Sequence, residues 1–187
     1  MNAAYLKTKH DAGLEYQAYL ATDPEKGEKW KAIGQQIRLS SDQKTLIEGF
    51  TREMKVLVVS GIWCGDCVQQ GPLLQAIADA NPRIDLKWVD RDEHEDLAKQ
   101  LMINQGLRVP VAIFLAEDYE PVSILGDRTL TRYRAIAAKQ LGPSCPLPGA
   151  PIPQDELEAT LQDWLDEFER VHLLLRLSGR LRQLHGD

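Results

Sequence analysis

The sequence is short of cysteine and of basic charge. Of its 187 residues only three are Cys, while Lys and Arg number 22 against 28 Asp and Glu, for a net charge of −6. An odd set of three cysteines does not make a disulfide framework, and a chain of this length can fold on one hydrophobic core without such staples. The acidic balance argues against a nucleic-acid partner, which would require clustered basic residues.

Long apolar runs are also missing. No stretch approaches the roughly 18 consecutive apolar residues of a membrane-spanning helix, and the longest run, residues 55–62, suits a buried strand. The first seven residues lack the apolar core of a secretory signal. We therefore expect no membrane partner, a location in the reducing cytoplasm and no structural disulfides.

Residues 1–52 have a helical pattern and are expected to form an N-terminal helical extension. Two sets of apolar residues have the spacing of helix faces: Trp30, Ile33 and Ile37, then Leu46, Ile47 and Phe50. Between them, Ser40 and Gln43 have the spacing of a capping box, in which each side chain binds the other's backbone N–H. A helix is therefore expected to begin just after Ser40.

Residues 53–141 alternate between strand and helix patterns, which predicts an α/β domain. The expected strands are 55–60, 84–90, 111–116 and 121–125, the last two joined by a turn too short for anything but antiparallel pairing. Helices are expected at 65–80, kinked by Pro72, and at 130–141. An acidic helix start at 92–96 should place Leu97, Leu101 and Met102 on an inner face.

The last part of the chain divides into a spacer and a helix. Residues 142–153 contain five prolines and are expected to run extended as a linker, within which Cys145 is expected to be an exposed thiol without a role. Residues 154–187 carry a wide apolar stripe at helical spacing: Leu157, Leu161, Trp164, Leu165, Phe168, Val171 and Leu175. We expect this stripe to pack on its own domain, the alternative being a partner or a dimer. The tail after Ser178 is expected to be frayed.

The chemistry concentrates at Cys64 and Cys67, which follow an expected strand and open an expected helix. This spacing places Cys64 at the exposed helix end, among unpaired backbone N–H groups, and Cys67 one turn further in. The positive end of the helix dipole favours a thiolate, so Cys64 is predicted to be the nucleophile and Cys67 the resolving cysteine. Gly65 between them is expected to permit a tight backbone.

Residues 63–67 read Trp-Cys-Gly-Asp-Cys and differ at one position from the thioredoxin signature Trp-Cys-Gly-Pro-Cys, so the chain resembles the thioredoxin superfamily. The likeness extends over residues 53–141, through Pro72, Asp90, the segment 108–110 and Gly126. With its helical extension, the sequence looks most similar to a bacterial group of thioredoxin-like proteins. The resemblance implies a three-layer α/β fold with a central mixed sheet and helices on both faces, to which the N-terminal helical extension and the C-terminal helix would be added.

The resemblance also implies a substrate-binding edge beside the cysteines. The bond between Val109 and Pro110 is expected to be cis, with the Val109 backbone pairing to an extended substrate segment. Trp63 would form an apolar rim, or else be a surface aromatic without a substrate role. No cofactor is implied. A zinc site is not expected, since two further ligands with paired spacing are missing.

Two departures from the thioredoxin pattern affect the mechanism. Val58 stands where thioredoxins have a buried aspartate, so Cys67 must lose its proton to water, to Cys64 or to Asp66. Asp66 replaces the proline of the signature, and its charge is expected to raise the pKa of Cys64 and to favour the disulfide form. The alternative is that Asp66 merely stabilises the helix start.

Three functions remain open at this point. The first is a cytoplasmic thiol/disulfide oxidoreductase that reduces disulfide-containing proteins or small thiols and is restored by a reductase or a low-molecular-weight thiol. The second is a thioredoxin-fold interaction or redox-sensing module without general reductase activity. The third is a dedicated partner within an oxidative-stress pathway, with the same chemistry and a narrow substrate range.

Overall fold

The structure is a computed structural model that describes residues 1–141 and 155–187. The predicted linker at 142–153, with Cys145, lies outside the described residues. Within the described ranges, the helices are all too short or too polar to cross a membrane.

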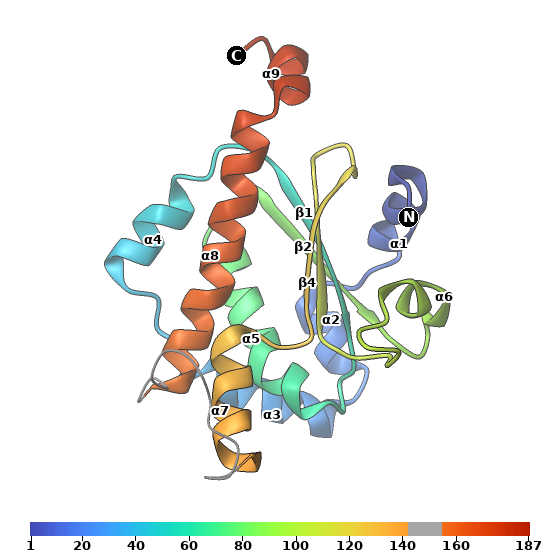
Figure 1. The fold of residues 1–187 in the computed structure, drawn as a ribbon, viewed down its shortest axis with the longest axis vertical. Helices are drawn as coiled ribbons and strands as arrows, with labels where there is room; N and C mark the ends of the chain where they lie inside the picture. Colours follow the sequence, from blue (N-terminus) through green and yellow to red (C-terminus); the bar gives the residue numbers. More distant parts are fainter. Residues whose placement is uncertain (142–154) are drawn as a thin grey trace.

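A four-stranded mixed sheet forms the centre of the molecule (Figure 1). Its strands are β1 (Met54–Ser60), β2 (Ile84–Asp90), β3 (Val111–Leu115) and β4 (Pro121–Gly126). The spatial order is β2-β1-β3-β4, with β1 parallel to β2 and the other two pairings antiparallel. The antiparallel pairing predicted for the last two strands is confirmed. The central strand β3 is buried along its whole length and β1 almost so, as their continuous apolar runs predict.

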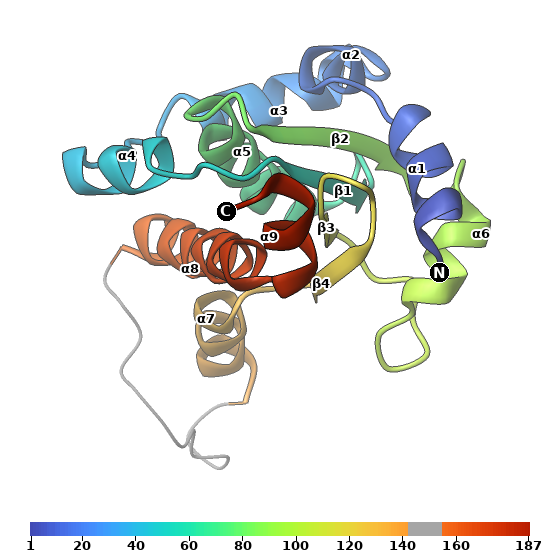
Figure 2. The same ribbon diagram turned by 90° about the horizontal axis from the view of Figure 1, so that it is seen from above.

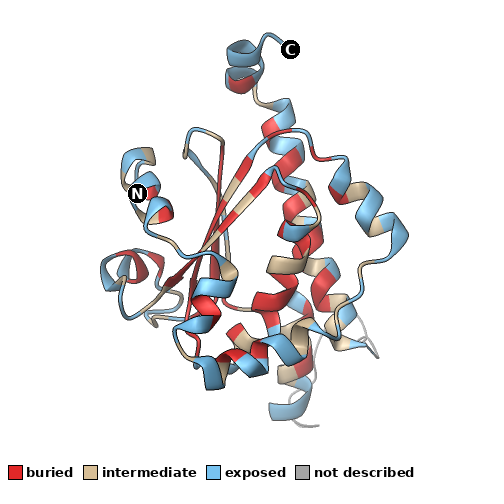
Figure 3. Ribbon diagram, turned by 180° about the vertical axis from the view of Figure 1, so that it is seen from behind, coloured by how far each residue is buried: buried red, intermediate tan, exposed pale blue. Residues whose placement is uncertain are grey.

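Helices cover both faces of this sheet (Figures 1 and 2). On one face lie α5 (Gly65–Asp79) and α8 (Glu156–Leu177), with α7 (Leu130–Gln140) packed beside α8. On the other face lie α1 (Ala3–Asp11) and the short α6 (Glu95–Ala98). This arrangement is the predicted three-layer thioredoxin-like fold. Buried residues gather on the sheet and on the helix faces turned toward it (Figure 3).

The N-terminal extension is helical, as predicted. After α1 come α2 (Tyr16–Ala21), α3 (Pro24–Gly34) and α4 (Ser41–Glu48). The capping box is present, since Ser40 and Gln43 each accept a hydrogen bond from the other's backbone N–H. Two details of the prediction are wrong, because α3 ends at Gly34, before Ile37, and α4 ends at Glu48, before Phe50.

The extension packs directly on the sheet and on α5. Leu14 exchanges two backbone hydrogen bonds with Trp88 of β2 and so covers part of that edge strand. Trp30 lies against Gly71 of α5, where an added Cβ would come within 2.0 Å of the indole ring. Glycine is therefore the residue that lets α3 approach α5 this closely.

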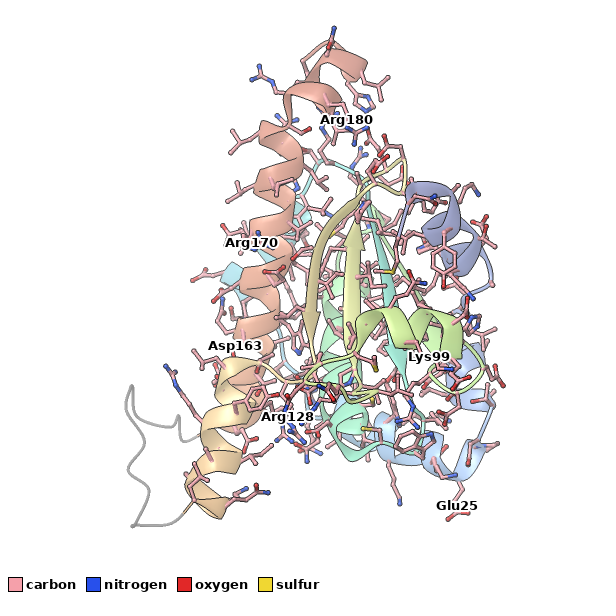
Figure 4. All side chains as sticks on the ribbon, turned by 45° about the vertical axis from the view of Figure 1, so that its right-hand side comes forward. Glu25, Lys99, Arg128, Asp163, Arg170 and Arg180 are labelled. Atoms are coloured by element: carbon pink, nitrogen blue, oxygen red, sulfur yellow. The ribbon has the colours of Figure 1, made fainter. Side chains whose placement is uncertain are left out.

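The apolar stripe of α8 packs on its own chain, which confirms the favoured reading of that pattern. Phe168 makes an edge-to-face contact with Phe114 of β3, with ring centroids 5.0 Å apart. The expectation of a frayed tail is wrong: residues after Ser178 form α9 (Gly179–His185). Leu181 is buried, and Arg180 pairs with Asp118 in the turn between β3 and β4, at the end of the molecule opposite Arg128 (Figure 4).

The acidic segment at 92–96 forms less helix than expected. α6 has only four residues and continues as a 3-10 turn, η1 (Lys99–Leu101). Leu97 and Leu101 are buried as predicted. Met102 is 51% exposed, because the backbone becomes extended there and turns its side chain away from the core. The prediction of an inner position for Met102 is therefore wrong.

Candidate redox-active site

The two cysteines lie where β1 gives way to α5. β1 ends at Ser60, and Cys64 is the N-cap residue of α5, with its backbone N–H bonded to the Gly61 carbonyl and its carbonyl bonded to Val68. The Cys64 sulfur is half-buried and that of Cys67, in the first turn, is buried. Both are free thiols, and the Cys67 thiol is within hydrogen-bonding reach of the Cys64 sulfur.

This setting ionises Cys64. The hydrogen bond from the Cys67 thiol, together with the backbone N–H groups of Cys67 and Asp66, lowers the pKa of Cys64 to about 6. Partial burial and the negative charge of Asp66 act in the opposite direction without reversing the result. As predicted, the charge of Asp66 raises the pKa of Cys64, but the hydrogen bonds to the Cys64 sulfur lower it by more. Near neutral pH Cys64 is mainly thiolate, the form that attacks disulfides.

Cys67 has the opposite character. Burial raises the pKa of its thiol well above the ordinary value, and the neighbouring Cys64 raises it further. Val58 is fully buried on β1 and provides no carboxylate. The buried hydroxyl of Ser60, at the end of the same strand, acts on the pKa of Cys67 in the lowering direction without reversing the result.

The segment opposite Cys64 has the predicted cis bond between Val109 and Pro110. The Cys64 sulfur lies 3.6 Å from the Val109 carbonyl oxygen. Gly126, the last residue of β4, permits this packing, because a Cβ there would lie 2.6 Å from the Pro110 carbonyl oxygen. The structure thus brings Cys64, Val109 and Pro110 together.

Trp63 lies at the rim of the site and is 45% exposed. The guanidinium group of Arg91 is 4.5 Å from the centroid of its ring, and Arg91 also donates a hydrogen bond to the Leu107 carbonyl. This contact joins the rim to the segment that leads to Pro110. Nothing in the sequence pattern distinguishes Arg91 except its position just after β2, so the sequence did not predict this contact.

Asp66 points toward two arginines that the sequence analysis also missed. Its carboxylate accepts hydrogen bonds from Arg128 at 2.6 and 2.9 Å and from Arg132 at 3.0 Å. Arg128 lies where the chain passes from β4 to α7 (Figure 4). Although partial burial raises it, the two guanidinium groups hold the pKa of Asp66 below its usual range. Asp66 is therefore a poor acceptor for the Cys67 proton.

Gly65 has no steric requirement for glycine. An added Cβ would meet no atom within 4 Å, and its φ lies outside the left-handed region. The expected need for a tight glycine backbone between the cysteines is not found.

The N-terminal extension supports the loop before Cys64. The indole N–H of Trp30 on α3 donates a hydrogen bond of 3.1 Å to the Ile62 carbonyl, and both groups are buried. Residues before position 53 therefore help to hold the cysteine loop, a contribution that the sequence pattern did not indicate.

A family model described as thioredoxin matches residues 13–137. No curated protein matches the chain. The chain is similar to a protein of unknown function from Pseudomonas aeruginosa whose crystal structure is known. The two sequences are 20% identical, the TM-score is 0.69, and the match covers 91% of this chain and 98% of the other. An HIV epitope-scaffold is 18% identical, with a TM-score of 0.62 over 100% and 99%. Fasciola hepatica thioredoxin is 23% identical, with a TM-score of 0.36 over 53% and 91%.

Proposed function

Since the chain belongs to the thioredoxin family, we propose that it is a thiol/disulfide oxidoreductase that reduces disulfides through Cys64 and Cys67. The observation that carries the proposal is the half-buried Cys64 at the start of α5, with the buried thiol of Cys67 in the first turn of the same helix. A thiolate at this position combines reactivity with access from solvent.

The proposed reaction has two exchanges. The Cys64 thiolate attacks one sulfur of a substrate disulfide, the substrate S–S bond breaks, and the other substrate sulfur leaves as a thiolate. Cys67 then loses its proton and attacks Cys64, which forms the Cys64–Cys67 disulfide and releases the second substrate sulfur. Two electrons pass from the dithiol to the substrate.

The substrate segment is proposed to lie along Val109 and Pro110. An extended peptide there would place its disulfide against the Cys64 sulfur, and main-chain hydrogen bonds to Val109 would align it. Trp63, held by Arg91, would supply an apolar wall beside it.

The proposed substrates are disulfides of proteins or of small thiols, and the proposed setting is a reducing cytoplasm. A reductase or a low-molecular-weight thiol would restore the dithiol.

A trapping experiment identifies the substrates. With Cys67→Ser the mixed disulfide on Cys64 cannot be resolved, so targets accumulate covalently. Many trapped proteins would indicate a general reductant, and one would indicate a dedicated pathway.

A second candidate is an interaction or redox-sensing module. The observation that favours it is a group of exposed leucines near the end of α8, namely Leu173, Leu174 and Leu177. Exposed apolar groups of this kind mark protein contact sites in many soluble proteins. Under this candidate the dithiol would not turn over substrates.

Reduction of insulin disulfides by dithiothreitol separates the two candidates. We expect the parent chain to accelerate the reaction and Cys64→Ser to abolish the acceleration. Cys145→Ser is the matched control, since it removes a thiol outside the motif, and it should leave the rate unchanged. Equal rates for the parent and Cys64→Ser would overturn the oxidoreductase proposal and favour the module.

A further inference from the structure

A buried carboxylate lies just after β4 and takes no part in the proposed exchanges. Asp127 is 3% exposed. Its carboxylate accepts one hydrogen bond from the hydroxyl of Tyr133 on α7 and another, of 3.2 Å, from the guanidinium group of Arg108. Although burial raises it, these two donors hold the pKa of Asp127 below its usual range, so the carboxylate is ionised near neutral pH. A buried charge costs stability unless it is paired, so the contact with Arg108 matters.

The backbone of Asp127 is tied to the helix that carries both cysteines. Gln70 is fully buried on α5, one turn beyond Cys67. Its side-chain amide donates a hydrogen bond of 3.0 Å to the Asp127 carbonyl and accepts one of 3.4 Å from the Thr129 backbone N–H. Asp127 therefore has a fixed place relative to α5.

Arg108 connects this fixed carboxylate to the segment opposite Cys64. It directly precedes Val109, whose carbonyl oxygen lies 3.6 Å from the Cys64 sulfur. The Arg108 side chain is 40% exposed, whereas that of Asp127 is 4% exposed. An exposed arginine has many rotamers available to it, and a charge-assisted hydrogen bond to a buried carboxylate restricts them. The segment that contains Val109 is therefore anchored to α5 through the Asp127 carboxylate.

We propose that Asp127 is a positioning residue, which acts through Arg108 to hold Val109 and Pro110 in the arrangement that an extended peptide needs beside Cys64. The inference rests on the proposed oxidoreductase function and names its substrate class: disulfides carried on a peptide main chain, in preference to those of small thiols. Asp127 is too buried to touch the substrate itself. Small errors in the placement of a substrate cost large factors in rate, so a residue away from the reacting sulfurs can matter.

Arg128 provides a second route from Asp127 to the cysteines. It lies 3.7 Å from the Asp127 carboxylate, but its shorter contacts, of 2.6 and 2.9 Å, are with Asp66. Loss of the Asp127 charge therefore leaves Asp66 paired. We expect the reactivity of Cys64 toward a small disulfide to change little, and this separates the two routes.

Two matched disulfide probes test the positioning role on full chains in which Cys67→Ser and Cys145→Ser leave Cys64 as the one cysteine. One probe is a short, uncharged peptide whose single cysteine is disulfide-linked to thionitrobenzoate. The other is N-acetylcysteine amide linked in the same way. Attack by Cys64 releases the same coloured thiolate from both probes, so the ratio of the two rate constants reports recognition of the peptide main chain.

We expect the chain with Asp127 and Arg108 intact to react faster with the peptide probe. Asp127→Asn leaves one acceptor oxygen for two donors and removes the charge, and Arg108→Met removes the guanidinium group. Each should lower the ratio about fivefold or more, while the rate with the small probe changes less than about twofold. The double variant should lose no more than Arg108→Met alone, because Asp127 acts through Arg108.

Tyr133→Phe is the matched control, since it removes a hydrogen bond to the same carboxylate without touching Arg108, and it should keep the ratio of the intact chain. A ratio for Asp127→Asn equal to that of Tyr133→Phe, additive losses in the double variant, or an intact chain without preference for the peptide would each overturn the positioning role. Failure of Cys64 to react with either probe would instead overturn the proposed function. Far-ultraviolet circular dichroism of each variant ensures that folded chains are compared.

Discussion

Asp66, which stands at the proline position of the thioredoxin signature, is bound by Arg128 through two hydrogen bonds of 2.6 and 2.9 Å. The charge of Asp66 opposes ionisation of Cys64, and a guanidinium group from a residue 62 positions away lies directly against it. The ion pair keeps Asp66 charged beside Cys64, whose pKa is lowered by the Cys67 thiol and the backbone N–H groups.

Substitutions of Asp66 and of Arg128 should shift the pKa of Cys64 in opposite directions. Asp66→Asn removes the negative charge and leaves the arginines, so the pKa of Cys64 should fall below its value of about 6, by up to about one pH unit. Arg128→Gln exposes the Asp66 charge and should raise the pKa of Cys64. Thiolate absorbance at 240 nm across a pH titration measures both. A raised or unchanged value for Asp66→Asn would refute the electrostatic account.

Alanine substitutions at two glycines of α5 test how closely the N-terminal extension packs on this helix. Gly71→Ala places a Cβ against the Trp30 ring and should lower the free energy of unfolding by about 1–3 kcal/mol. Gly65→Ala meets no atom within 4 Å and should leave stability unchanged or raise it by up to about 1 kcal/mol. Urea denaturation compares the two variants, and an equal cost for both would show that the Trp30 contact is not what requires Gly71.

The docking of α8 is tested by two substitutions on that helix. Phe168→Ala removes a fully buried ring that contacts Phe114, and it should cost about 3–5 kcal/mol in unfolding free energy. Leu177→Ala changes a side chain that is 77% exposed and should cost less than about 0.5 kcal/mol. If chemical denaturation found Phe168→Ala as harmless as Leu177→Ala, α8 would not be part of the core.

The burial of His172 should make the stability of the fold depend on pH. Its ring is buried and stacked on Phe50 with centroids 4.6 Å apart. Burial lowers the pKa of His172, and nearby Arg176 lowers it further. The unfolded chain therefore binds a proton more readily than the folded one, so stability is full above the unfolded value near 6.5 and declines as the pH falls below it.

The variant His172→Phe keeps the stacking and removes the titration. Its unfolding free energy should fall less than that of the parent between pH 7 and pH 5. His94→Phe, on the loop before α6, is the control and should follow the parent. A parent-like slope for His172→Phe would show that this histidine does not contribute to the dependence.

The sheet and the cysteine pair could be predicted because their signals are local. Residues 56–59 are a continuous apolar run rich in valine, and such a run has few alternatives to a buried central strand. Cys64 and Cys67 are tied to that strand by three residues. The resemblance in the segment 108–110 then predicted the cis bond before Pro110, although sequence alone would favour trans.

The missed parts depend on contacts between distant residues. Arg132 and Arg128 reach Asp66 from α7 and the segment before it, and nothing in their own neighbourhood distinguishes them from surface arginines. Trp30 belongs to an extension whose place over the sheet cannot be inferred from helical spacing. The helix α9 was missed because one buried side chain, Leu181, and the pairing of Arg180 with Asp118 hold it in place.

The pH dependence of Cys64 alkylation measures how readily the Cys64 thiol ionises. Reduced chain is treated briefly with iodoacetamide at a series of pH values, and the labelled peptide that contains Cys64 is quantified by mass spectrometry. We expect a midpoint near pH 6, set by the Cys67 thiol and the backbone N–H groups at the start of α5. A midpoint near that of an ordinary thiol, about 8.5, would contradict it.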